Sequence, residues 1–223
     1  MNHSPNVNNY IAITMNNNSE TPKRRGRGRP RAFDRDEALD RAIQIFWAKG
    51  YGPTSVEELT SQMGISPPSL YAAFGNKHDL FMLAMDRYAE TVGGLPTKAF
   101  SEAPDLRRAV LGLFETTIRC ATTTNRPKGC LLVSVASEMA VRDEDVRKKL
   151  AHGYAARVKA ISERVVADQE AGRLPQHPSA ERLARMIVSV THGLVARARM
   201  GATRDELSGL AADFLDTLVP ASD

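Results

Sequence analysis

The residues of this chain with the clearest chemical character are six cations that lie close together near its start. They occupy positions 23–31, which read KRRGRGRPR. The formal net charge of the whole chain is +4, so the remainder carries a net charge of −2. A local excess of cations is suited to a polyanionic partner. The alternative is a solvated tail that only aids solubility, so this run alone does not establish a function.

Residue types that carry catalysis or hold metals are sparse and scattered. The histidines stand at positions 3, 78, 152, 177 and 192, with no metal-ligand spacing among them. The chain has neither a phosphate-binding glycine loop nor the G-x-S-x-G pattern of a nucleophile elbow. We therefore expect no enzyme, no catalytic residue, no metal site and no cofactor.

The cysteine count and the apolar runs restrict the compartment. Cys120 and Cys130 are too few for a disulfide framework, which indicates reduced thiols in a cytosol. No apolar run approaches the roughly 18 residues that a membrane span needs. The first residues lack the basic and apolar regions of a secretory signal. We expect a cytoplasmic protein without a membrane partner.

Apolar periodicity divides the chain into a tail and a helical part. Positions 1–22 are rich in Asn, Ser and Thr, so we expect a disordered tail that includes the basic arm and ends at position 32; Met15 is an alternative start. Glycine and proline at 93–96 mark a loop between a domain at 33–93 and a larger domain at 94–223. The pattern predicts an all-α fold of about nine helices, at 34–49, 55–63, 67–74, 77–91, 104–123, 130–141, 144–171, 179–200 and 204–219.

Two short helices joined by a tight turn stand out at about 55–74. Thr54 is expected to cap the first helix and Ser66 the second, whose tandem prolines lie in the first turn, where an N–H has no partner within the helix. Gly64 can adopt the positive φ that the turn needs. This is the arrangement of a helix-turn-helix motif, in which the second helix enters the major groove of DNA.

The segment from about position 33 to position 88 resembles the DNA-binding domain of the TetR family of bacterial transcription regulators. One departure is Thr60, where the family more often has Ala; its hydroxyl can bond back to its own helix, so we expect no loss of fold. The resemblance covers roughly a quarter of the chain and rests on Ala38…Phe46, Gly50-Tyr51, Thr54-Ser55-Val56, Leu59, Gly64-Ile65-Ser66, Leu70-Tyr71, Phe74 and Lys77…Leu80.

The resemblance implies a repressor that binds a palindromic operator in double-stranded DNA as a homodimer. The recognition helix has no Arg, Asn or Gln, so specificity is expected to depend on Ser and Ala contacts, thymine methyl groups and DNA shape. Tyr71 packed within the protein and Lys77 as an ordinary surface lysine are the alternatives for these two residues. The implied DNA-binding residues are Arg27, Arg29 and Arg31 of the arm, then Thr54, Ser55, Ser66, Pro67, Pro68, Ser69, Tyr71 and Lys77.

The family plan also implies a small-molecule effector and a dimer surface in the larger domain. For each residue of both sets, packing in the chain's own core is the alternative. The candidate effector residues are Phe114, Ile118, Cys120, Val133, Met139, His152, Tyr154, Met186 and His192. The candidate dimer residues, which recur along one face of each of the last two helices, are Leu183, Ile187, Val190, Leu194, Leu207, Phe214 and Leu218.

Two further interpretations of the function stay open from the sequence. Arg126 and Lys128 lie near Cys120 and Cys130 and could lower a thiol pKa, which would suit a sensor of electrophiles or oxidants. Cys130 as a purely structural residue is the competing reading. A third class of function is a helical adaptor without affinity for DNA. The basic arm beside an intact helix-turn-helix motif argues against this class.

The arm yields the first prediction. Replacing all six basic residues of 23–31 with Ala should weaken operator binding and flatten its dependence on salt, because fewer phosphate counterions are released. Fluorescence anisotropy over a series of salt concentrations measures both quantities. An unchanged affinity and an unchanged salt slope would show that the arm is an inert tail.

Overall fold

The computed structural model describes residues 33–219, and helices are the only regular secondary structure within this range, which confirms the all-α prediction. The basic arm lies outside the described residues. None of the described helices is both long and apolar enough to cross a bilayer. The elements are α2 (Arg35–Lys49), α3 (Val56–Met63), α4 (Pro67–Phe74), α5 (Lys77–Glu90), η1 (Val92–Gly94), α6 (Leu95–Glu102), α7 (Leu106–Thr122), η2 (Leu132–Ala136), α8 (Ser137–Met139), α9 (Glu144–Glu170), α10 (Ala180–Arg199) and α11 (Arg204–Leu218).

The described residues form ten α-helices, one more than expected, because α6 occupies part of the predicted loop. Pro96 lies in the first turn of α6, where its missing N–H removes no helical hydrogen bond. The glycines before it form the 3₁₀ turn η1 between α5 and α6. The expected helix at 130–141 is also irregular, since its middle part, η2, is a π-helix.

The ends of the first helices follow from local capping. The side chain of Asp34 accepts hydrogen bonds from two backbone N–H groups of α2, and Ser66 accepts one from the N–H of Ser69. Asn76 and Asp79 form a reciprocal capping box at the start of α5. The prediction that Thr54 caps α3 is wrong, because Ser55 is the cap and accepts from the N–H of Glu58.

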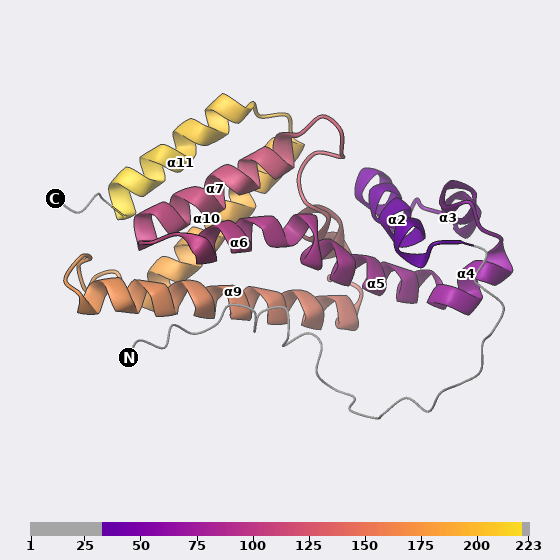
Figure 1. Ribbon diagram of the computed structural model, residues 1–223, viewed down its shortest axis with the longest axis horizontal. Helices are drawn as coiled ribbons and strands as arrows, with labels where there is room; N and C mark the ends of the chain where they lie inside the picture. The colour runs from indigo at the N-terminus through magenta and orange to yellow at the C-terminus, as the bar shows by residue number, and fades with distance from the viewer. Residues whose placement is uncertain (1–32, 220–223) are drawn as a thin grey trace, which may run out of the picture.

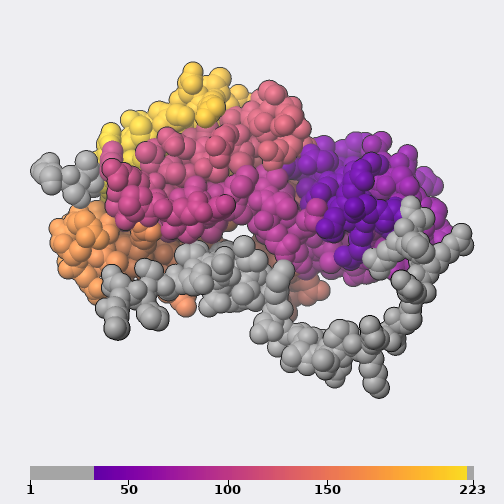
Figure 2. Space-filling view, in the orientation of Figure 1, coloured from indigo at the N-terminus to yellow at the C-terminus, as the bar shows by residue number. Residues whose placement is uncertain are grey.

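Two lobes are visible along the molecule (Figures 1 and 2). The first lobe is built around the buried faces of α2–α5, and it also includes four buried side chains from beyond position 94: Leu131, Val135, Ala136 and Val146. Arg87 of α5 donates two hydrogen bonds to the carboxylate of Asp40, at 2.5 and 2.6 Å, and it lies 3.2 Å from Asp36. These contacts hold α5 against α2.

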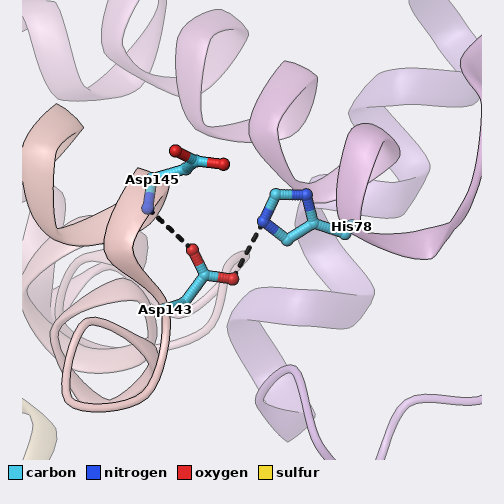
Figure 3. A group of neighbouring side chains, drawn as sticks. All are labelled: His78, Asp143 and Asp145. Carbon is cyan, nitrogen blue, oxygen red and sulfur yellow. Dashed lines mark hydrogen bonds and ion pairs between the residues drawn. The ribbon is translucent and has the colours of Figure 1, made fainter.

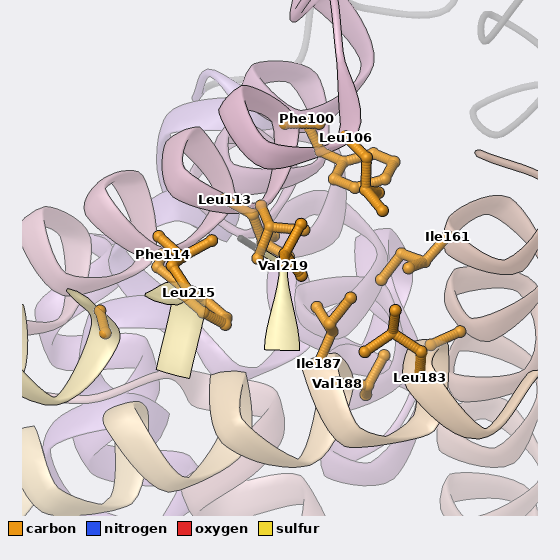
Figure 4. Close-up of a cluster of buried hydrophobic side chains, with 14 of the residues drawn as sticks. Phe100, Leu106, Leu113, Phe114, Ile161, Leu183, Ile187, Val188, Leu215 and Val219 are labelled. Atoms are coloured by element: carbon orange, nitrogen blue, oxygen red, sulfur yellow. The ribbon is translucent and has the colours of Figure 1, made fainter. Parts of the chain in front are cut away.

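The second lobe packs α7, α9, α10 and α11 around one apolar cluster (Figure 4). The stripe that was predicted to form a dimer surface mostly lies inside this cluster. Leu183, Ile187, Leu194 and Leu207 are at most 2 % exposed, so the assignment of these four residues to the dimer interface is wrong. Their stripe faces the chain's own core.

The remaining three candidates of that stripe are partly buried. Val190, Phe214 and Leu218 pack against the same cluster from its edge. The ring of Phe214 meets the ring of Phe114 edge-on, with centroids 5.6 Å apart. The apolar stripe of an amphipathic helix predicts only that one face is buried, not what covers it. Here α7 and α9 of the same chain cover these faces.

Leu70 is fully buried in the first lobe, so its truncation should be costly. We expect Leu70→Ala to lower the free energy of unfolding by about 2–5 kcal/mol, through lost burial and the cavity that remains. Urea denaturation followed by circular dichroism measures the change. Val141→Ala is the matched control, since Val141 is 79 % exposed. Equal effects of the two substitutions would contradict the packing described.

Candidate nucleic-acid interface

The turn between α3 and α4 is closed by a glycine in the left-handed conformation. Gly64 has φ 69° and ψ 32°, a region that residues with a Cβ adopt at a cost. The N–H of Ile65 donates to the carbonyl of Thr60 at 3.0 Å, which completes the end of α3. Arg41 of α2 donates to the carbonyl of Gln62 at 3.3 Å, so the turn is fixed from α2 as well.

Thr60, the departure from the family pattern, causes no disturbance of α3. Its hydroxyl donates to the carbonyls of Val56 and Glu57, each at 3.0 Å. This confirms the expectation that the hydroxyl bonds back to its own helix.

Helix α4 buries one face and exposes the other. Leu70 and Phe74 are at most 3 % exposed, whereas Pro67, Pro68 and Tyr71 lie on the surface. Figure 1 places α3 and α4 at the end of the molecule farthest from α11. Tyr71 is 52 % exposed, so it is not packed within the protein, and it is free to meet a ligand.

Some polar residues around the motif are exposed and can contact DNA, whereas others already make hydrogen bonds within the protein. Ser55 is exposed at the N-terminus of α3, where unpaired N–H groups attract anions. Thr54 is 1 % exposed, and its hydroxyl donates to the carbonyl of Gly50 at 2.7 Å. The assignment of Thr54 to a phosphate contact through its side chain is therefore withdrawn. Ser66 and Ser69 share a hydrogen bond between their hydroxyl groups at 2.9 Å.

Lys77, at the start of α5, is positioned by the ring of Tyr51, which belongs to the family pattern in the sequence but not to the implied DNA-binding residues. Its Nζ lies 4.3 Å from the centroid of the Tyr51 ring. That ring in turn packs on Phe46 and Phe81, with centroids 5.9 and 5.1 Å away. Burial lowers the pKa of Lys77. A cation–π contact that restrains the ammonium group reduces the entropy lost when it binds a phosphate.

The two thiols lie at the junction of the lobes. They are half-buried and not joined by a disulfide. Burial, followed by the neighbouring Cys130 thiol, raises the pKa of Tyr88, and the Tyr88 ring packs edge-on against Trp47 of α2. Burial raises the pKa of Cys120, although Arg126 and Arg119 act in the opposite direction. A raised pKa disfavours the nucleophilic thiolate, so the sensor hypothesis gains no support at Cys120.

The nine candidate effector residues do not line one cavity. Phe114 and Ile118 are core residues, while His152, Tyr154 and Met186 are exposed. The others, Cys120, Val133, Met139 and His192, are partly buried. A cavity of about 20 Å³ between α6, α7 and α9 is lined by none of the nine; its lining is Thr97, Phe100, Leu113, Arg157, Ala160 and Ile161.

A larger hollow is open to the surface. It is a groove of about 420 Å³ beside α9 and α10, and of the nine candidates only Tyr154 lines it. The cavity of about 20 Å³ has room for one water molecule.

Comparisons with known proteins agree with this geometry. Residues 38–83 match the family described as "Bacterial regulatory proteins, tetR family", and residues 107–213 match "Tetracyclin repressor-like, C-terminal domain". The HTH-type transcriptional repressor ComR of Escherichia coli (strain K12) is 30% identical over 193 residues, which cover 86% of this chain and 92% of that protein. The HTH-type transcriptional repressor BdcR of the same strain is 32% identical over 185 residues, covering 83% and 89%.

A solved structure is also similar over most of its length. It is the TetR family transcriptional regulator CifR, a cysteine mutant complexed with 26-bp double-strand operator DNA. Its TM-score is 0.75 at 36% sequence identity, and the match covers 84% of this chain and 98% of that one.

Fold and motif together define a helix-turn-helix transcription regulator, which is a DNA-binding protein. The chain belongs to the TetR family of bacterial transcription regulators. This confirms the resemblance seen in the sequence and the prediction that the protein is not an enzyme. The roles of individual residues stay predictions.

His192 on α10 yields a prediction about pH. Burial, followed by the nearby charge of Arg157, lowers its pKa in the folded protein. The unfolded chain, in which histidine titrates near ~6.5, therefore takes up the proton first as the pH falls, and stability is lost below that value. We expect urea midpoints at pH 8 and pH 5 to differ more for the native protein than for His192→Gln. Parallel changes in the two proteins would contradict the proposed burial.

Proposed function

We propose that this protein is an effector-responsive repressor that binds a palindromic operator as a homodimer. The observation that carries the proposal is the exposed face of α4, anchored from below by Leu70 and Phe74 at the end of the molecule. Two such helices about 34–36 Å apart would read two half-sites one turn of DNA apart. The CifR structure bound to operator DNA supports this mode of binding.

The contacts to DNA are expected to come from two kinds of group. Pro68, Ser69 and Tyr71 face the bases and the backbone from α4. Ser55 and Lys77 hold phosphates at the N-termini of α3 and α5, where the helix dipole favours an anion. Arg27, Arg29 and Arg31 of the arm add cations in the minor groove. Affinity then depends mostly on phosphate contacts, which do not distinguish one base sequence from another.

The dimer surface is best assigned to the outer faces of α10 and α11. Three large apolar residues are exposed here: Met186 on α10 (39 %), Met200 at the C-cap of α10 (78 %) and Leu210 on α11 (46 %). Gly193 lies on α10 together with Met186, and a Cβ there would meet no atom within 4 Å. Exposed apolar side chains beside open space suit a second copy, which would cover them in a four-helix contact.

The effector is expected to act on α6. The small cavity is lined by Thr97 and Phe100 of α6 and by Arg157 of α9, whose Nε is buried without a hydrogen-bond partner among the described residues. A molecule that enlarges this space and accepts a hydrogen bond from Arg157 would displace α6. Because η1 joins α6 directly to α5, the displacement would change the distance between the two recognition helices.

Lys77→Gln tests the proposed contact with DNA. The promoter DNA beside the protein's own gene is titrated with protein, and fluorescence anisotropy reports binding. We expect at least about tenfold weaker binding, because a charge-assisted hydrogen bond to phosphate is lost. The slope of log K against log salt should fall by about 0.9 per contact, or roughly 2 for a dimer.

The matched control is Lys98→Gln on α6. Lys98 has a side chain that is 69% exposed and lies 3.8 Å from Glu102, so its loss should leave DNA binding unchanged. Equal behaviour of the two variants would remove Lys77 from the interface. If the native protein ignored double-stranded DNA of every sequence at low salt, the proposed function itself would be refuted.

A further inference from the structure

Three potential metal ligands meet where the first lobe contacts α9: His78, Asp143 and Asp145 (Figure 3). His78 lies in the first turn of α5, whereas the two aspartates lie at the start of α9. His78 Nε2 is 2.9 Å from Asp143 Oδ2. One ligand atom from each of the three residues lies within 4.8 Å of the other two.

The three side chains differ in the hydrogen bonds and ion pairs that they already make. Asp143 accepts hydrogen bonds through Oδ1 from the N–H groups of Asp145 and Val146, which caps α9 and leaves Oδ2 facing His78. The carboxylate of Asp145 has no hydrogen bond or ion pair with any residue of 33–219. The contact with His78 needs only one carboxylate, that of Asp143. The carboxylate of Asp145 therefore remains available for a ligand.

The donor set selects the class of ion. One imidazole with two carboxylates suits a first-row divalent ion, whereas Mg²⁺ and Ca²⁺ prefer oxygen ligands alone. Tetrahedral Zn²⁺ with ligands at about 2.0–2.2 Å would place those atoms roughly 3.3 Å apart. The spacing of 2.9 to 4.8 Å can reach that value through small side-chain movements. A fourth position would remain for water.

We propose that His78, Asp143 and Asp145 bind one divalent transition-metal ion, with Zn²⁺ the best match, and that the ion joins α5 to α9. The lone pair of Nε2 would then face the ion, and Asp143 Oδ2 would bind the ion in place of Nε2. Since Lys77 precedes His78 on α5, the ion would hold the proposed phosphate-binding turn against the regulatory domain. That consequence rests on the proposed function, whereas ion binding does not.

Isothermal titration calorimetry of the tag-free full chain, treated with EDTA and titrated with ZnCl₂ without DNA, tests the site. We expect one ion per chain, with affinity reduced at least about tenfold in His78→Gln and in Asp145→Asn. Asp143→Asn should have the same effect while keeping a good N-cap on α9. Asp145 is exposed, so its variant is expected to stay folded, which circular dichroism checks.

Two controls exclude other ligands. His152→Gln removes an exposed histidine elsewhere on α9, and the double variant Cys120→Ser/Cys130→Ser removes both thiols. Both should bind Zn²⁺ like the native chain. The proposal is overturned by the absence of saturable binding, by native affinity in His78→Gln or Asp145→Asn, or by loss of binding in the double cysteine variant. Because DNA is absent, a failure of operator binding cannot imitate any of these outcomes.

Discussion

An eight-residue helix has too few backbone hydrogen bonds to persist alone in water, so α4 depends on what its inner face buries. Leu70 and Phe74 supply that burial. Phe33 lies 6.2 Å from the Phe74 ring, and the guanidinium of Arg35 lies 5.0 Å from the same ring. With its inner face anchored in this way, α4 can present prolines, serine and tyrosine outward. The surface available to DNA is therefore a consequence of the core.

Helix α5 connects this anchored motif to the rest of the molecule. Its apolar face packs in the first lobe, and Arg87 binds Asp40 of α2 with two hydrogen bonds. On the side of α9, Lys149 pairs with Asp86, and His78 pairs with Asp143. The first lobe and the regulatory helices therefore share one rigid element. A displacement of α6 or α9 has a direct mechanical route to the recognition helix.

Sequence reasoning was most successful where the determining interaction is local, although it placed the cap of α3 one residue early, at Thr54 instead of Ser55. Ser66 and Gly64 were identified because a cap or a left-handed turn is decided within a few residues. It failed where the role of a residue depends on which distant element packs against it. The stripe of Leu183 and Ile187 shows that one face of α10 is buried, but it contains no information on whether the partner is the same chain or a second copy. His78 and Asp143 are far apart in the sequence, and only the packing of α5 on α9 brings them together.

The composition of α4 explains why its position matters so much. A recognition helix without Arg, Asn or Gln gains little from hydrogen bonds to base edges, so phosphate contacts must supply most of the affinity. Phosphates repeat along the duplex at regular intervals, and groups that bind them tolerate little change in spacing. Lys77 and the N-terminus of α3 belong to two helices, α5 and α3, that both pack against α2. If the proposed function holds, a small rotation of α5 would be enough to switch the protein, because it would move the phosphate-binding groups at both half-sites together.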